Sequence, residues 1–289
     1  MSEAEQQADL VEATEASWSI RRILVALDAS TNSRVALAAA IGLAETFKSE
    51  IEGLFIEDIN LFRLAELPFS REVRFAEVGL QQLEQESIQR RLRARAAILK
   101  RELTDMAAEH DVPSSFRVIR GPVSQELLAA ALESDLLALG RIGQTILRRS
   151  HLGSTARMVV ERASSVVLLT TPEMVVGPII ALYDGSPTAN RLLHLAATLA
   201  ERSGDLRVLV WAATDDEAFE RRQQAVEILT PLRVQAQFQH LSGDNPLLVL
   251  EWVNRQKGSL LVLGRSDDLP PDIFQTLLDE AGQHILVIR

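Results

Sequence analysis

The sequence predicts an α/β fold with two tandem domains, each an open, twisted, Rossmann-like parallel sheet with helices on both faces. Short apolar runs alternate with helical patterns along the chain, which is typical of parallel strands that are connected by helices. The chain also repeats itself, since the motif at residues 23–30 returns at residues 179–186. A chain of 289 residues is long enough for two domains that each bury a core.

The elements of the first copy follow from this alternation. Short apolar runs bounded by polar or turn-forming residues indicate strands at residues 23–27, 51–56, 116–119, 136–139 and 166–169. Helical patterns are found at residues 35–48, 123–133 and about 155–162.

The second copy repeats this order in a shorter form. Its strands are expected at residues 179–182, 206–211, 234–238, 260–263 and 285–288, and its helices at residues 189–202, 217–229 and 246–255. The expected domains are therefore residues 20–172 and residues 177–289. The last strands of the two domains, residues 166–169 and 285–288, are expected to pair within the chain.

The extra length of the first copy lies at about residues 59–112. Apolar residues recur there at the spacing of a long helix, at Leu92, Ala96, Leu99, Leu103 and Met106. We expect this helix to cover the sheet, with its arginines on the solvated face. The alternative is an exposed surface that binds a partner or joins whole chains in a homodimer.

Composition narrows the class of function. The absence of cysteine excludes disulfides, thiolate metal sites and a cysteine nucleophile. A net charge of −10 argues against nucleic acid as the main partner. Residues 1–19 are acidic and polar, so a mobile tail is expected rather than a signal peptide, and no run reaches the roughly 20 apolar residues of a membrane span. These features favour a cytoplasmic binding protein.

Glycines cluster where the strand at residues 136–139 is expected to end. Gly140, Gly143 and Gly153 have the spacing Gly-x2-Gly-x9-Gly, and Ser154 and Thr155 follow directly. Glycine between a strand and a helix lets backbone N–H groups approach an anion closely, and a helix N-terminus adds favourable partial charge. The segment therefore predicts an anion-binding loop.

Other polar and apolar positions are expected to meet this loop. Asp28, Ile56 and Gly140 each follow or end a predicted strand. Ligand crevices of open parallel sheets lie beyond the carboxyl ends of the strands, so these three positions are expected to converge.

The glycine spacing resembles the nucleotide-binding signature of the ATP-binding universal stress proteins, a family with the adenine nucleotide alpha hydrolase-like fold. The resemblance extends over nearly the whole chain and implies a stress-response regulatory module whose ligand is ATP, with or without Mg²⁺. The nucleotide-binding residues that it implies are Ala26, Asp28, Ile56, Leu139, Gly140, Arg141, Gly143, Gly153, Ser154 and Thr155.

The resemblance also implies a role for each part of this set. Asp28 would contact the base and ribose end, the backbone of Ile56 the adenine edge, and Leu139 the sugar or base. The glycines with Ser154 and Thr155 would hold the phosphates.

Two assignments have structural alternatives. Asp28 returns as Asp184 in the second copy, so it could instead form a turn or cap a helix in both copies. The arginines near the loop are either phosphate contacts or a solvated surface; these are Arg141, Arg148, Arg149 and Arg157.

The second copy lacks the glycine signature. Asp267 stands at the position of the second glycine, and a constant offset places Leu277 and Leu278 at the third glycine and its serine. Carboxylates there would repel phosphate. We therefore expect a second domain that binds no nucleotide.

Enzyme signatures are also missing from the sequence. It contains no Gly-x4-Gly-Lys-(Ser/Thr) loop and no Gly-x-Ser-x-Gly elbow. We expect a binding protein, with slow ATP hydrolysis or autophosphorylation at Ser154 or Thr155 as an incidental activity at most. The alternative function is a nucleotide-independent scaffold that contacts a partner through residues 61–106.

Overall fold

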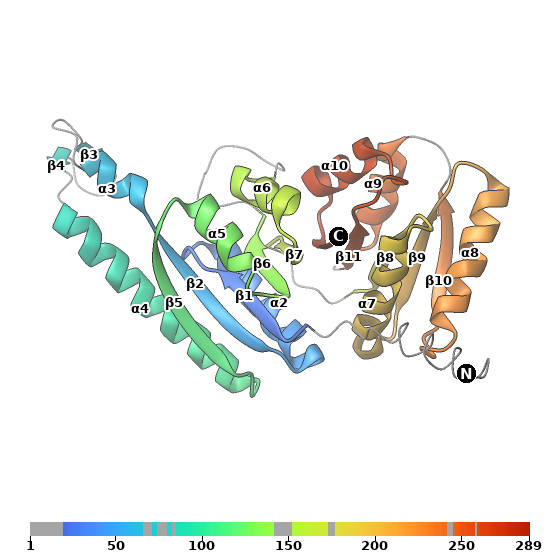
Figure 1. Ribbon diagram of the computed structural model, residues 1–289, viewed down its shortest axis with the longest axis horizontal. Helices are drawn as coiled ribbons and strands as arrows, with labels where there is room; N and C mark the ends of the chain where they lie inside the picture. The colour runs from blue at the N-terminus through green and yellow to red at the C-terminus, as the bar shows by residue number, and fades with distance from the viewer. Residues whose placement is uncertain are drawn as a thin grey trace, which may run out of the picture.

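The computed structural model describes residues 20–65, 71–73, 80–82, 85–141, 152–172, 177–241, 245–257 and 259–289. A continuous ten-stranded sheet runs through it in the order β10-β9-β8-β11-β12-β7-β6-β1-β2-β5 (Figure 1). This arrangement confirms the predicted α/β class.

We call the elements from β1 to β7 the first half. They are β1 (Arg22–Ala26), α2 (Thr31–Phe47), β2 (Glu50–Asp58), α3 (Ile59–Ala65), β3 (Arg71–Val73), β4 (Leu80–Gln82), α4 (Gln85–Glu109), β5 (Ser114–Gly121), α5 (Val123–Ala131), β6 (Leu136–Gly140), α6 (Ser154–Arg162) and β7 (Val166–Thr170). The short strands β3 and β4 form a separate antiparallel pair.

The second half has the same order without the insertion. Its elements are β8 (Ile179–Tyr183), α7 (Pro187–Ser203), β9 (Leu206–Trp211), α8 (Asp215–Leu229), β10 (Ala236–Leu241), α9 (Pro246–Arg255), β11 (Leu260–Gly264), α10 (Pro271–Glu280) and β12 (His284–Ile288). The helix α10 was not expected from the sequence.

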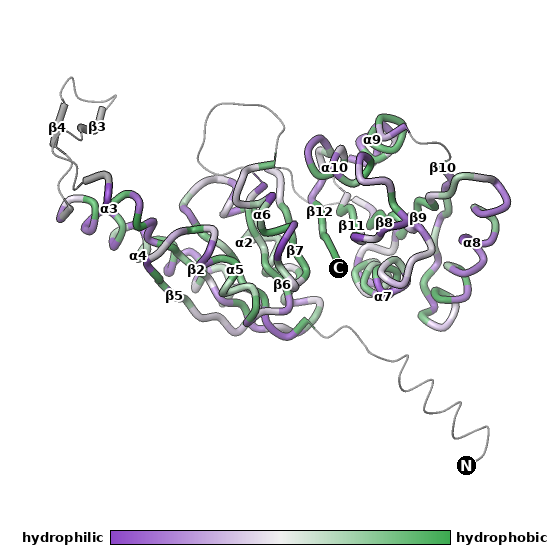
Figure 2. Tube along the Cα trace, turned by 45° about the horizontal axis from the view of Figure 1, so that its top comes forward, coloured by the Kyte–Doolittle hydropathy of each residue, from purple (hydrophilic) through white to green (hydrophobic). Residues whose placement is uncertain are grey.

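The two halves meet along one antiparallel pair of strands. Within each half, the strands of the ten-stranded sheet are parallel, but β12 runs antiparallel to β7, with Ile285 opposite Leu169 and Val287 opposite Val167. Because the strand order is the same on both sides of this pair, an approximate two-fold rotation relates the halves. Hydrophobic residues are concentrated along these central strands (Figure 2).

Helices cover both faces of the sheet. One face packs against α2, α4, α7 and α8, and the other against α5, α6, α9 and α10. In α4, Leu99 and Leu103 are each 1% exposed, and Met106 packs against the same core. The apolar stripe of α4 therefore covers the sheet, and the alternative of an exposed apolar partner surface on these residues is wrong. Within the described ranges, no helix is long and apolar enough to span a membrane.

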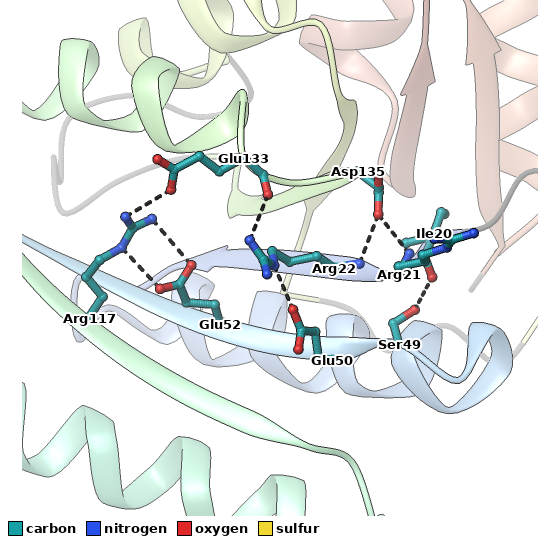
Figure 3. Close-up of polar contacts among 9 residues, drawn as sticks. All are labelled: Ile20, Arg21, Arg22, Ser49, Glu50, Glu52, Arg117, Glu133 and Asp135. Carbon is teal, nitrogen blue, oxygen red and sulfur yellow. Dashed lines mark hydrogen bonds and ion pairs between the residues drawn. The ribbon is translucent and has the colours of Figure 1, made fainter.

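Polar contacts tie the amino ends of the strands in the first half together (Figure 3). The Asp135 carboxylate, just before β6, accepts the backbone N–H groups of Arg21 and Arg22 at 2.8 and 2.9 Å. The Arg22 side chain donates to Glu50 at the start of β2, at 2.7 Å. These contacts fix the register of β1, β2 and β6, whose carboxyl ends form the candidate site.

Candidate functional site

A cavity of about 230 Å³ opens at the carboxyl ends of β1, β2 and β6, beside the start of α6. Most of the residues predicted for nucleotide binding line it. These are Ala26, Asp28, Ile56, Leu139, Gly140, Arg141, Gly153, Ser154 and Thr155. Gly143, Arg148 and Arg149 lie outside the described residues, so the structure does not place them.

One end of the cavity is the N-terminus of α6. Gly153 is the N-cap residue of α6, and it makes no side-chain capping hydrogen bond. Its own N–H donates to the carbonyl of Arg141 at 2.9 Å, which closes the loop that begins after β6. The first turn of α6 contains no acidic residue. Its free N–H groups and the helix dipole therefore favour an anion at this end.

Another part of the cavity lining is apolar. Leu54, Val123 and Leu127 line it together with Ile56 and Leu139. Leu54, Val123 and Leu127 were not among the residues predicted from the sequence. The α5 residues Val123 and Leu127 face the crevice because α5 packs beside β1 and β2. A cavity with an apolar part and an anion-binding part suits an amphipathic, negatively charged ligand.

Asp28 combines a structural contact with a position in the cavity. Its carboxylate accepts the N–H of Ser30 at 2.9 Å, and Ser30 in turn caps α2. Asp184 makes the same contact with Ser186, also at 2.9 Å. The turn-forming role is therefore present in both halves, while Asp28 also lines the cavity.

Gly140 is required by packing as well as by its place in the cavity. A Cβ atom built on Gly140 would lie 2.7 Å from the Cβ of Asn32 in α2. At the equivalent Gly264, the nearest atom to such a Cβ is Cγ2 of Thr188, at 3.1 Å. This close approach explains a glycine in both halves independently of phosphate binding.

Arg141 requires a correction. Its guanidinium is buried, 7% exposed as a residue, and donates to the backbone carbonyls of Leu278 and Ala281 in the second half. Burial lowers its pKa to about 10, and the nearby Asp279 carboxylate partly opposes this change. The expectation that this positive charge surrounds a phosphate is therefore wrong, although part of the residue lines the cavity.

Arg157 also points to the second half. Its guanidinium donates to Asp279 at 2.6 Å and to Gln275 at 2.9 Å, and both partners lie on α10. Both described arginines near the loop therefore use their guanidinium groups to bind the second half, Arg141 as a buried residue and Arg157 as a partly exposed one. Their partners are far away in the sequence, so no local pattern indicated them.

At the equivalent strand ends of the second half, an open cavity is lined by residues that include Ser186, Arg265 and Ser266. Trp211 occupies the register position of Ile56, because Leu206 pairs with Ile179 as Ile51 pairs with Ile23. Trp211 is 5% exposed, and its carbonyl accepts a hydrogen bond from Arg221.

The loop that follows β11 also differs from its counterpart after β6. The Ser266 hydroxyl bonds the carboxylate of Asp184. The helix α10 begins at Pro271 with Pro270 as its N-cap, so these prolines occupy the positions of Gly153 and Ser154. Leu277 and Leu278 are buried within α10, and their predicted placement at its start was wrong because the loop is shorter than a constant offset assumes.

The open parallel sheet, with its crevice beyond the strand ends and a helix N-terminus at that crevice, defines a Rossmann-like α/β protein. A sequence model of the universal stress protein family matches residues 19–171. The chain belongs to this family. It is 26% identical over 151 residues to a universal stress protein of Methanocaldococcus jannaschii, and the match covers 52% of this chain and 81% of that protein.

Solved structures share the fold over nearly the whole chain. A universal stress protein from Archaeoglobus fulgidus is 14% identical with a TM-score of 0.70, covering 95% of this chain and 99% of that one. A protein of unknown function from Pseudomonas aeruginosa is 16% identical with a TM-score of 0.61, covering 94% of each chain. At these identities the likeness concerns the fold alone.

Proposed function

We propose that the protein is a regulatory module of the stress-response type that binds one ATP in its first half. The observation that carries this proposal is the convergence of the predicted nucleotide-binding residues on one cavity. Those residues come from β1, β2, β6 and α6, which are distant in the sequence. The cavity also has the two kinds of surface that an adenine nucleotide requires.

Each part of the ligand has a proposed partner. Leu54, Ile56 and Leu139 would pack against the base, whose edge the backbone of Ile56 would read. The Asp28 carboxylate would accept from a ribose hydroxyl. The N–H groups at the start of α6 and the hydroxyls of Ser154 and Thr155 would hold the phosphates.

Mg²⁺ is proposed to arrive with ATP rather than to occupy a site of its own. The described residues contain no group of three or more His, Cys, Asp or Glu side chains that could hold a metal ion. Protein-bound Mg²⁺ commonly keeps several waters and relies on substrate phosphates for its remaining ligands.

We propose that the second half binds no nucleotide. In the second half, the larger and buried Trp211 stands at the position of Ile56 and its carbonyl accepts from Arg221, while the Ser266 hydroxyl bonds the carboxylate of Asp184. A nucleotide would have to displace both contacts. Pro271, at the position of Ser154, also lacks the backbone N–H that Ser154 offers at the start of α6.

Binding without substantial turnover is part of the proposal. Among the described residues that line the cavity, Asp28 is the sole carboxylate, and it is engaged by the N–H of Ser30. The alternative of a nucleotide-independent scaffold that contacts a partner through residues 61–106 loses the apolar stripe of α4, which is buried, whereas Leu61 and Ile98 in the same region are exposed.

Calorimetric titration of nucleotide-stripped protein with ATP and Mg²⁺ tests the proposal. We expect binding to wild type, and a loss of more than about tenfold in affinity for the variant Gly153→Asp/Ser154→Leu, because a carboxylate at the start of α6 repels phosphate. Asp272→Asn, at the start of α10, is the matched control and should bind like wild type. Absence of binding to wild type, or equal binding by the site variant, would contradict the proposal.

A further inference from the structure

The cavity of the first half is flanked by two arginines whose side chains are both held by α10. The Arg141 guanidinium lies on the carbonyls of Leu278 and Ala281, in the last turn of α10 and its C-cap. These carbonyls have no partner within the helix, and the negative end of the helix dipole lies there. A buried guanidinium that lost them would be left uncompensated, so the contact is costly to break.

The second contact fixes α6. Arg157 lies one turn into α6, and it pairs with Asp279 at 2.6 Å and Gln275 at 2.9 Å. The same Asp279 carboxylate accepts the N–H of Leu152, just before the N-cap Gly153, at 3.4 Å. Arg157 lines a second cavity between α6 and α10 and not the candidate nucleotide cavity. Its charge therefore orients α6 rather than facing the ligand.

Arginines of the second half also contact α6, but at its C-terminus, away from the candidate site. Arg265 donates to the carbonyl of Glu161 at 3.2 Å, and Arg289 to that of Val160 at 3.3 Å, near the C-terminus of α6. Each half thus holds the end of the other's last helix. The contacts from α10, in contrast, reach Arg141 and Leu152 at the two described ends of the loop of the candidate site.

We propose that α10 is a brace for nucleotide binding. Arg141 and Arg157 in the first half and Asp279 in the second are positioning residues, which hold the loop ends and the first turn of α6 where they receive the phosphates. The second half thereby contributes to the site without binding a nucleotide. This inference rests on the proposed ATP site of the first half.

Paired charge-neutralising variants separate bracing from direct electrostatics. If the charges acted on ATP directly, Arg157→Gln would weaken binding and Asp279→Asn, which removes a negative charge, would strengthen it. If they act as a brace, both variants weaken ATP binding, by about three- to tenfold. The double variant should then bind no more weakly than either single variant, because both remove the same contact.

The experiment is calorimetric titration of the full chain with ATP and Mg²⁺, with the melting temperature of each variant measured beside it. Arg162→Gln and Glu280→Gln neutralise exposed residues on the same two helices and should bind like wild type. Arg141→Lys, which keeps the charge but not the forked contact, should weaken ATP binding while the protein remains folded.

The outcomes distinguish this inference from the proposed function. Tighter binding by Asp279→Asn, or unchanged affinity in all of the brace variants while wild type binds ATP, would overturn the brace and leave the ATP site intact. If wild type itself does not bind ATP, the proposed function fails. A variant that is folded at the assay temperature and binds weakly supports the brace.

Discussion

Gly140 and Gly264, the last residues of β6 and β11, show how close packing selects a side chain at a strand end. At Gly140, an added methyl group would lie 2.7 Å from the Cβ of Asn32 and 3.2 Å from its carbonyl carbon. Neither atom can move without shifting the start of α2. At Gly264, the nearest contact is the longer distance of 3.1 Å to Cγ2 of Thr188, a side-chain atom rather than backbone.

We therefore expect Gly140→Ala to destabilise the fold more than Gly264→Ala. The cost at Gly140 should be about 1–3 kcal/mol, the usual range for overpacking a well-packed region. Urea unfolding of the two variants against wild type measures the difference. Equal losses at the two positions, or a neutral Gly140→Ala, would show that this packing argument is wrong.

His284 introduces a dependence of stability on pH. It is 3% exposed, and burial lowers its pKa to about 4. Its Nδ1 accepts the backbone N–H of Thr171 at 3.3 Å, which requires an unprotonated nitrogen. Because the unfolded chain binds the proton more tightly, the stability that the unprotonated His284 contributes is fully present above about pH 6.5. It is lost as pH falls toward 4.

The loss over that range should be about 3 kcal/mol in the free energy of unfolding. His284→Gln should flatten this part of the stability profile. Denaturant unfolding at a series of pH values provides the measurement. A profile for His284→Gln that falls as steeply as that of wild type would contradict this role.

At the scale of elements, apolar runs were sufficient to locate the strands of the sheet. The expected strand at residues 136–139 is observed as β6, Leu136–Gly140, and the four residues Leu136 to Leu139 are buried. A buried parallel strand needs only a short apolar run between turn-forming residues, so it can be identified locally. The prediction of the sheet therefore depended little on the family resemblance.

The helix α10 could not be predicted in the same way. Its apolar residues, such as Ile273 and Leu277, are visible in the sequence, but a constant offset between the copies obscured the shorter loop before it. The true equivalents become clear from the C-caps, since Ala163 N–H bonds Val159 as Ala281 N–H bonds Leu277. When one copy of a repeat has a shorter loop, the two copies are aligned by their hydrogen-bond patterns rather than by a constant offset.

The candidate site was predictable to a similar degree. Positions such as Asp28 and Ser154 follow from strand ends and glycine spacing, and the structure brings them to one cavity. The destination of Arg141 was not predictable, because its carbonyl partners are contributed by backbone from the other half of the chain. Long-range contacts of this kind leave no local signature.

At the scale of the whole molecule, the continuous sheet should make the two halves unfold together. The β7–β12 pair is buried, and the contacts from Arg141 and Arg157 to α10 join the halves on one face of the sheet. We expect one calorimetric transition whose van't Hoff and calorimetric enthalpies agree. Two resolved transitions would show that the halves are independently stable.

The central claim concerns the number of nucleotides that one chain holds. Native mass spectrometry of the full chain with excess ATP and Mg²⁺ counts them directly. We expect a mass shift that corresponds to one ATP per chain, and loss of that shift in Gly153→Asp/Ser154→Leu. No bound nucleotide would contradict the ATP site, and two per chain would contradict a second half that binds none.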